Sequence, residues 1–530
     1  MRNFLRALPK SYFAKNHPVT YKYVDKFPEG VKNEIIKFRE NTMHIPKVIG
    51  GVRNYDILVK QQICPYDYSI VCDYSVSNLK DIRDAVEESE RGIKIWSDIG
   101  EQEKCDIFLR AADLVCGEYR DKLLAATVFG QGKNIYQAEI DAICELADFL
   151  RFNVQYYGEL NGQNLISQEG EKNEMGWRGL GGFVGAISPF NFTAIGGNLM
   201  TAPLLMGNPV LWKPSDSSIL SNYLFYEIMC EAGMPPEAVQ FVPALPEDFM
   251  EVVTNAKNMS GLVFTGSSEV FDNILLRVYK NVSLYDSYPR VVGETGGNNY
   301  HFIFPDMKDD IDEVVDKTIR GAFEYAGQKC SATSRVYVPK SLYIPFMDRL
   351  SSKMDKMKVG SPEEDYNFMS AVIHERSYNV CRDWIKENYD NIIYGGITDN
   401  REGFYVSPTV IQYDTINDNR WRKEIFGPVL SLYVYDDGND NGVRNALNIC
   451  SAITPYRLTG AVFYRDDKWR DVITEVGKNV GNFYVNDKST GSVVGNQPFG
   501  GFGKSGTNDK AGAKYFLVRF GNMIVHKIVG

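Results

Sequence analysis

A cysteine in a small, polar setting is the first residue whose type suggests chemistry. Cys330 lies in the run Gly327–Ser331 (GQKCS). A thiolate is a strong nucleophile where a positive or dipolar environment stabilises it and substrate can reach it. The polar approach argues against packing in apolar surroundings, although a lone cysteine is more often a core residue. Cys330 is therefore a candidate nucleophile that needs partners elsewhere in the chain.

Two other sites offer the groups that such a nucleophile requires. Glu294 ends a short apolar run and precedes a glycine-rich turn, where a carboxylate could act as a general base or could simply be solvated. Asn191 lies between Phe190 and Phe192, just past another apolar run. A buried amide must donate its N–H groups, and an oxyanion and a backbone carbonyl are the two candidate acceptors.

A third group of polar residues, in Leu211–Asp216 (LWKPSD), could hold the hydroxyl groups of a ribose. Two phosphate-binding motifs are incomplete. Gly503–Ser505 ends like a phosphate-binding loop, but Pro498 stands where the motif needs glycine. Gly179–Val184 has valine in place of the third glycine of the dinucleotide fingerprint and precedes a strand. A dinucleotide bound to this chain is therefore held without that fingerprint.

The elements that must position these residues are strands alternating with helices. Residues 77–152 have helical periodicity, and a further helix is expected at about 217–232. The predicted strands are Phe183–Ile187, Pro209–Trp212, Val239–Val242, Gly261–Phe264 and Arg290–Val292. This alternation predicts an α/β fold with a parallel, doubly wound sheet, which binds ligands at the carboxyl ends of its strands. The polar segment Glu159–Trp177, with its turn signals, is expected to form a protruding hairpin arm.

Composition excludes several classes of function. The 530-residue chain is 44% hydrophobic and 24% charged, with a formal net charge of −10, so a nucleic-acid partner is disfavoured. We find no apolar run of about 18 residues and expect no membrane span. The nine cysteines are scattered without a CxxC pair, which favours a reducing compartment. None of the five histidines has a partner at metal-ligand spacing, so no metal site is expected.

The first 24 residues are basic, with no acidic residue before Asp25. Phe4, Leu5 and Leu8 could form one face of a short helix, as in a mitochondrial presequence. An ordinary basic tail is the alternative.

Taken together, these motifs resemble those of the aldehyde dehydrogenase superfamily, in family order and over nearly the whole chain. The matching blocks are the Asn191 motif, Trp212–Asp216, Phe264–Ser267, Glu294–Gly297, Cys330, Glu424–Val429 and Pro498–Gly501.

Longer blocks resemble the 1-pyrroline-5-carboxylate dehydrogenase family within that superfamily. They are Gly130–Lys133 with Gln137–Asp141, Ile187–Leu199, Phe323–Ser334, Asn482–Gln497 and Ser505–Gly512. The chain departs from the family at Asn298, where lysine is usual, at Phe502–Lys504, and after Phe520.

The resemblance implies an aldehyde dehydrogenase fold. We expect an N-terminal extension at 1–29, a Rossmann-like NAD-binding domain at 30–158 and 178–296, and a second α/β catalytic domain at 297–504. Segments 159–177 and 505–530 would form a small oligomerisation arm, and the protein would be a homodimer or a higher homo-oligomer.

The resemblance also assigns roles in the oxidation of an aldehyde by NAD. Cys330 would be the nucleophile, Glu294 the base that activates water, and Asn191 an oxyanion donor. The cofactor-binding residues would be Ser188, Lys213, Ser215, Asp216, Gly266, Ser267, Glu424 and Phe426. Asp216 is shorter than glutamate and leaves room near the ribose 2′-position, so use of NADP stays open.

The implied small-molecule substrate is L-glutamate 5-semialdehyde, which is in equilibrium with 1-pyrroline-5-carboxylate, in the second step of proline catabolism. Ser331, Gly491 and Ser492 would hold its carboxylate, Phe192 and Phe499 its aliphatic chain, and Glu145 its ammonium group. The mitochondrial matrix is the expected location, with the cytoplasm as the alternative.

Three alternatives remain. A sister enzyme making acyl-CoA or acyl-phosphate would lack the base carboxylate, and a catalytically silent binding protein would have lost Cys330, Asn191 or Glu294. The third alternative is a dehydrogenase of another semialdehyde. These motifs do not distinguish it from a dehydrogenase of L-glutamate 5-semialdehyde.

Overall fold

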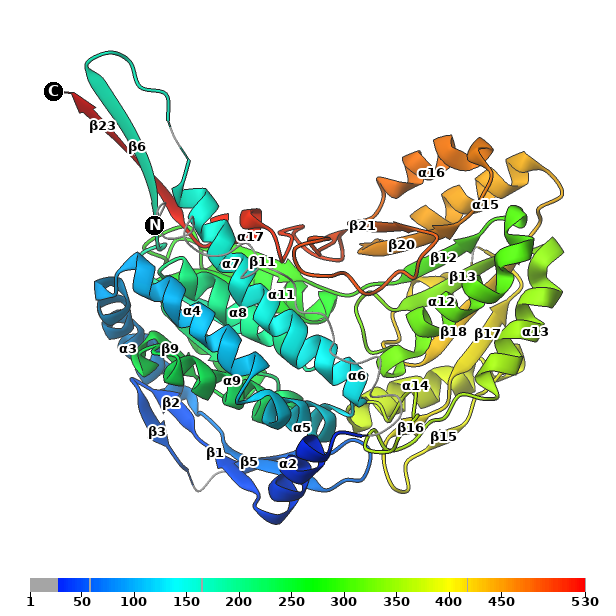
Figure 1. Ribbon diagram of the computed structural model, residues 1–530, viewed down its shortest axis with the longest axis horizontal. Helices are drawn as coiled ribbons and strands as arrows, with labels where there is room; N and C mark the ends of the chain where they lie inside the picture. The colour runs from blue at the N-terminus through cyan, green and yellow to red at the C-terminus, as the bar shows by residue number, and fades with distance from the viewer. Residues whose placement is uncertain (1–26, 57–58, 164, 417, 530) are drawn as a thin grey trace.

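The computed structural model describes residues 27–56, 59–163, 165–416 and 418–529. The basic segment 1–24 lies outside the described residues. Two seven-stranded sheets, each covered by helices, form the body, and a two-stranded arm projects from it (Figure 1).

The first sheet has the order β11-β10-β7-β8-β9-β2-β3. Its five parallel strands are almost entirely apolar, as expected for strands buried on both faces. They are β7 (Phe183–Ile187), β8 (Val210–Lys213), β9 (Val239–Phe241), β10 (Met259–Thr265) and β11 (Arg290–Glu294). The antiparallel strands β2 (Lys47–Ile49) and β3 (Val52–Asn54) form one edge. The predicted doubly wound α/β fold is confirmed.

Helices follow the parallel strands in turn: α8 (Thr193–Leu205), α9 (Ile219–Glu231), α10 (Pro246–Val253) and α11 (Ser268–Lys280). The helical stretch predicted at 77–152 consists of α3 (Leu79–Asp98), α4 (Glu101–Cys116), α5 (Arg120–Gln131), α6 (Ile135–Ala138), a π-helix (Glu139–Glu145) and α7 (Leu146–Asn161). Before them lie α2 (Glu29–Glu40) and a small sheet of β1 (Met43–Ile45), β5 (Ile70–Ser75) and β4 (Val59–Ile63).

The second sheet has the order β14-β17-β18-β13-β12-β20-β21, with antiparallel β14 at one edge. Its strands are β12 (Asn299–Ile303), β13 (Thr333–Pro339), β14 (Ile392–Tyr394), β17 (Thr409–Tyr413), β18 (Val429–Tyr435), β20 (Thr459–Phe463) and β21 (Asn482–Val485). The associated helices are α12 (Ile311–Phe323), α13 (Tyr343–Met354), α14 (Glu375–Glu387), α15 (Asp440–Ala452) and α16 (Arg470–Gly477).

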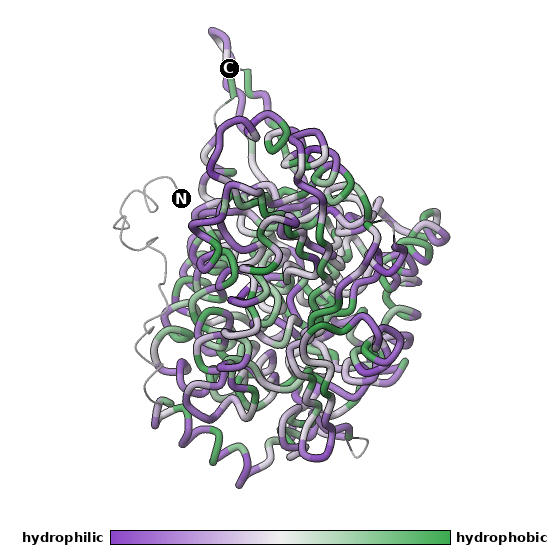
Figure 2. Tube along the Cα trace, turned by 90° about the vertical axis from the view of Figure 1, so that its right-hand side faces the viewer, coloured by the Kyte–Doolittle hydropathy of each residue, from purple (hydrophilic) through white to green (hydrophobic). Residues whose placement is uncertain are grey.

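The arm pairs two distant segments. β6 (Glu171–Arg178) pairs antiparallel with β23 (Asn522–Val529), the last strand of the chain. Figure 2 shows this arm standing clear of the body, with the C-terminus near its tip. Segment Glu159–Trp177 is therefore not a hairpin by itself, because its strand pairs with β23, and α7 continues to Asn161 before the arm begins.

Candidate active site

Strand register brings several of the predicted residues to one edge of the first sheet. Ile187 pairs with Lys213 and Phe264 pairs with Ile187, so β7, β8 and β10 end close together. Thr265 pairs with Glu294 at the end of β11. Ligands bind at the carboxyl ends of parallel strands, and this edge faces the second sheet across the centre of the molecule (Figure 1).

The Cys330 loop follows α12 through an unusual backbone. Tyr325 and Ala326 have φ of 54° and 52°, and Gly327 has φ of 66°. A non-glycine residue in this region costs about 1–3 kcal/mol and persists only where its surroundings enforce it. Here the Tyr325 hydroxyl donates to the carbonyl of Gln131 at 2.9 Å, and a Cβ at Gly327 would lie 2.3 Å from the carbonyl oxygen of Gly427. Strain next to the candidate nucleophile is thus held by tertiary contacts.

Cys330 is half-buried, and next to it Gln328 is fully buried, with its side-chain Oε1 accepting the N–H of Ile373 at 2.8 Å. Burial, together with the carboxylates of Glu294 and Glu424, raises the pKa of the Cys330 thiol, and the backbone N–H of Ser331 acts in the opposite direction. A thiol whose pKa is raised must lose its proton before it can act as a nucleophile.

Glu294 is the candidate base that would activate a water molecule. Glu294 is half-buried at the end of β11, and its buried Oε1 has no hydrogen-bond partner among the described residues, so its carboxylate is not that of a solvated turn residue. Burial raises the pKa of Glu294 well above its ordinary value, while the N–H of Gly501 and the charge of Lys510 lower it. Gly500 leaves space for this carboxylate, because a Cβ there would lie 2.5 Å from Oε1.

Asn191 is buried and in contact with the cysteine loop. Its Nδ2 donates to the carbonyl of Gln328 at 3.2 Å. Of the two candidate acceptors, the backbone carbonyl is therefore present. An amide NH₂ has two donors, and one remains for an oxyanion.

The residues predicted to hold a cofactor lie on the neighbouring strand ends. Lys213 is buried, and within the described part of the chain its Nζ has two polar partners, the Pro214 carbonyl at 3.2 Å and Asp216 at 3.8 Å. Burial lowers the pKa of Lys213. Asp216 also lies 3.7 Å from Lys60, and Ser215 accepts a hydrogen bond from the N–H of Ser217.

Ser188 differs from this group. Its Oγ accepts the indole N–H of Trp212 at 2.7 Å inside the core, so its hydroxyl supports Trp212.

Gly266 and Ser267 start α11, where Ser267 Oγ accepts the N–H of Val270. Unpaired backbone N–H groups at a helix start favour a phosphate. On the facing segment, Glu424 accepts the N–H of Gly297 at 2.7 Å, and burial raises the pKa of Glu424 to about 7. Phe426, with φ of 55°, packs edge-on against Phe190.

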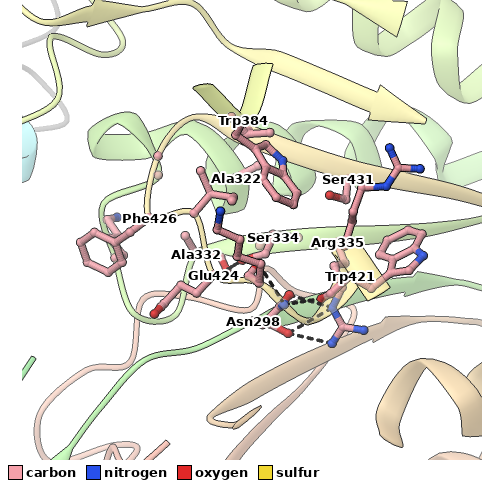
Figure 3. A pocket seen from close by; sticks show the side chains of 18 residues that line it. Asn298, Ala322, Ala332, Ser334, Arg335, Trp384, Trp421, Glu424, Phe426 and Ser431 are labelled. Carbon is pink, nitrogen blue, oxygen red and sulfur yellow. Dashed lines mark hydrogen bonds between the residues drawn. The ribbon is translucent and has the colours of Figure 1, made fainter. Parts of the chain in front are cut away.

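Figure 3 shows the pocket behind this segment, with Glu424 and Phe426 beside it. Asn298, the position that departs from the family pattern, donates to the carbonyl of Trp421 and accepts from Arg335 at 2.9 Å. It thus ties the start of β12 to the segment that carries Glu424. These groups together fit a dinucleotide: the buried amine of Lys213 and the start of α11 lie at the strand ends, and the half-buried carboxylate of Glu424 lies on the facing segment.

At the opposite end of the site, Ser331 shares a hydrogen bond of 2.7 Å with Thr490. Ser489 Oγ donates to the Ser331 carbonyl at 3.0 Å, and its N–H donates to buried His301. Gly491 has φ of 95°, which favours glycine. The 489–491 loop is therefore packed directly on the residue after Cys330.

The hydroxyl of Ser492 donates to the carbonyl of Gln497 at 2.9 Å. Its backbone N–H is then the donor that remains for a ligand. Phe499 is held by reciprocal backbone hydrogen bonds with Ala511. Phe192 lies under the ammonium of Lys133, 4.0 Å from the ring centroid. Glu145 ends the π-helix, and burial and Asp141 raise its pKa to about 8 against the opposing charge of Lys133.

Sequence reasoning missed several polar residues that support the site. Gln131 and Lys133 are buried and contact both the segment of Asn191 and that of Tyr325, and buried Asp141 accepts backbone N–H groups just after Asn191. The charge of Lys510 lowers the pKa of Glu294. Gln131, Lys133 and Asp141 lie in the longer blocks quoted above, but no local chemistry singled them out. Among the described residues, no group of three histidine, cysteine or acidic side chains is placed to hold a metal ion, and no helix is long and apolar enough to cross a membrane.

Comparison with known proteins agrees with this geometry. A model of the aldehyde dehydrogenase family matches residues 58–523, and the chain belongs to this family. The human mitochondrial delta-1-pyrroline-5-carboxylate dehydrogenase is 44% identical over 483 residues, covering 90% of this chain and 85% of that protein. A probable delta-1-pyrroline-5-carboxylate dehydrogenase of Schizosaccharomyces pombe is 45% identical over 487 residues, covering 90% and 88%.

Solved structures agree as well. The delta-pyrroline-5-carboxylate dehydrogenase of Mycobacterium tuberculosis superimposes with a TM-score of 0.92 at 37% identity, covering 97% of this chain and 95% of that one. The same enzyme bound with NAD gives a TM-score of 0.90 at 36% identity, with the same coverage. The predicted aldehyde dehydrogenase fold is confirmed.

Proposed function

We propose that this chain oxidises L-glutamate 5-semialdehyde to L-glutamate with reduction of NAD, the second step of proline breakdown. The observation that carries the proposal is the meeting of Cys330, Glu294 and Asn191 at one sheet edge, in a chain whose relatives are named for the oxidation of pyrroline-5-carboxylate. The retained Glu294 weighs against an acyl-CoA or acyl-phosphate enzyme, and the complete trio weighs against a silent binding protein.

Each protein group has a defined task. Cys330 Sγ gives its proton to a water molecule and attacks the aldehyde carbon. The Asn191 amide and the Cys330 N–H stabilise the resulting oxyanion, about 3 kcal/mol for each donor. Bound NAD supplies the acceptor for the hydride that leaves this carbon. Glu294 then takes a proton from the water that cleaves the thioester, which releases the acid and restores the thiol.

The cofactor is held by groups that leave the thiol free. Lys213, Ser215 and Asp216 bind the adenine ribose, Gly266 and Ser267 the pyrophosphate, and Glu424 with Phe426 the nicotinamide ribose. The Ser188 contribution is its backbone, since its hydroxyl serves Trp212. Lys60 and Lys213 both approach Asp216, which supports tolerance of a 2′-phosphate and hence of NADP.

The substrate lies between Cys330 and the 489–492 loop. Ser331 Oγ and the N–H groups of Gly491 and Ser492 bind its carboxylate, because hydrogen bonds from such donors to a charged acceptor are strong. Phe192 and Phe499 enclose the aliphatic chain, and ionised Glu145 binds the ammonium group.

The decisive experiment incubates the purified protein with NAD and a panel of semialdehydes and follows the absorbance of NADH. The glutamate semialdehyde should give the highest kcat/KM. A higher value for another semialdehyde would favour the second candidate, a dehydrogenase of that compound on the same scaffold.

The division of the chain into NAD-binding parts (30–158 and 178–296), a catalytic domain (297–504) and an arm (159–177 and 505–530) belongs to the same proposal. Exposed apolar side chains on β23, with Met523 55% and Val525 56% exposed, support an intersubunit role for the arm. Light scattering at micromolar concentration should give at least a dimer, and deletion of residues 522–530 should lower that mass. A monomeric intact protein would contradict the role of the arm.

The mitochondrial matrix is the proposed location. It is supported by the mitochondrial names of the human and zebrafish relatives and by the basic N-terminal composition. Import of a fluorescent fusion into mitochondria, lost when residues 1–24 are removed, would test it against a cytoplasmic location.

A further inference from the structure

A buried polar segment between α5 and the π-helix touches both loops that carry the proposed catalytic groups. Gln131 Nε2 donates to the carbonyl of Phe190 at 2.6 Å, next to Asn191. The carbonyl of the same Gln131 accepts the hydroxyl of Tyr325 at 2.9 Å, at the strained start of the Cys330 loop. One residue thus joins the two loops.

Two residues further along, a buried ion pair reaches the same two loops. Lys133 Nζ lies 2.7 Å from Asp141 Oδ2, with side chains 1% and 0% exposed. Asp141 also accepts the N–H groups of Thr193 at 3.0 Å and Ala194 at 2.8 Å. These are the first two backbone donors of α8, so the carboxylate holds the start of this helix directly after Asn191 and Phe192.

The cation of the pair completes the connection. Lys133 Nζ lies 4.0 Å from the ring centroid of Phe192 and 4.8 Å from that of Tyr325. Burial lowers the pKa of Lys133, while Asp141 raises it. A buried ion pair is costly, and apolar residues of similar volume often serve stability equally well. Apolar side chains could not accept two N–H groups of α8, so the geometry gives this pair a task beyond filling space.

We propose that Lys133 and Asp141 are positioning residues that keep the Asn191 amide in register with Cys330. The inference rests on the proposed dehydrogenase function. Asn191 itself has one long hydrogen bond, 3.2 Å to the Gln328 carbonyl, so the backbone on either side must set the place of its amide. A misplacement of about 1 Å can cost about 100-fold in rate.

The test is a double-mutant cycle on the single-turnover rate of NADH formation. Asp141→Asn, which keeps the volume and one acceptor, should lower this rate by about 10- to 100-fold. Asn191→Ala should lower it by about 100- to 1000-fold. If Asp141 acts through Asn191, the double variant should be no slower than Asn191→Ala by more than about threefold. Fully additive losses would overturn the positioning role.

Lys133→Met gives the second arm of the cycle and should lower the single-turnover rate in the same way. Its Kd for NADH, measured by fluorescence titration, should change by less than about twofold. The matched control is Lys47→Met on the antiparallel edge of the first sheet, where buried Lys47 pairs with Asp81 at 2.6 Å. It should lower Tm and leave the rate unchanged. An equal rate loss in the control would show that general destabilisation explains the effect, and would overturn the proposal.

If Lys133→Met does not fold, Asp141→Asn carries the cycle. A wild-type enzyme that forms no NADH from any semialdehyde would overturn the proposed function, and the inference with it. Additive losses in an active enzyme would overturn the positioning role alone.

Discussion

The cofactor side and the nucleophile side of the site are built in different ways. On the proposed cofactor side, Lys213 ends one parallel strand and Gly266 follows another, so each residue is placed by the sheet itself. On the nucleophile side, Cys330 follows two non-glycine residues with left-handed backbone, and Ser331 rests on a loop about 160 residues further along the chain.

This difference indicates how substitutions on each side should affect cofactor binding and chemistry. Strand ends are held by many ladder hydrogen bonds, so a substitution there removes mainly its own contact with the cofactor. The Cys330 loop is held by contacts from Gln131, Gly427 and Ser489, so substitutions around it alter chemistry. Four predictions test that separation.

The largest effect is expected for Cys330→Ala. Turnover should be lost, because no thioester can form, while the Kd for NAD should stay within about twofold, since the thiol is not part of the proposed cofactor site. Steady-state NADH formation and fluorescence titration would measure the two. Turnover above a few per cent of wild type would exclude Cys330 as the nucleophile.

Glu294→Gln should separate the two half-reactions. The variant should release a single burst of NADH per active site and then stall, because thioester formation does not need the base but hydrolysis does. In the wild type the raised pKa of Glu294 implies that hydrolysis speeds up as pH rises, because only the carboxylate accepts a proton. Stopped-flow absorbance would resolve the burst, and steady turnover without one would contradict the assignment.

Ser331→Ala should alter substrate choice. Loss of one hydrogen bond to a charged group costs about 1.5–3 kcal/mol, which lowers kcat/KM for glutamate semialdehyde by about 10- to 150-fold. Propanal, which has no carboxylate, is the control substrate and should change little. Equal losses for both would mean that Ser331, through Thr490, only positions Cys330.

The smallest effect concerns pH and Glu145, whose pKa is raised to about 8. The ammonium group binds the carboxylate form, so KM for the semialdehyde should fall by roughly tenfold as pH rises from one unit below this pKa to above it. Glu145→Gln should have a higher KM at high pH and lack this dependence. The substrate titrates in the same way with either protein, so the variant is a control for that titration. If KM of the variant depended on pH as in the wild type, the role of Glu145 would be refuted.

Sequence alone determined the sheet and its chemistry. Apolar runs of strand length separated by helices predicted β7, β8, β10 and β11 to within a few residues, because each element carries its own periodicity and turn signals. The residue types at their ends named Cys330, Glu294 and Asn191 as candidates, and their order in the chain indicated the family.

Only the tertiary structure decided how those residues are held. The buried pairing of Lys133 with Asp141 and the packing of Ser489 and Thr490 on Ser331 join segments that no local pattern relates. The raised pKa values of Cys330 and Glu294 likewise depend on burial. Desolvation and hydrogen bonding depend on which groups are close in space. The amino-acid sequence specifies which groups are present, and the tertiary structure determines what surrounds each of them.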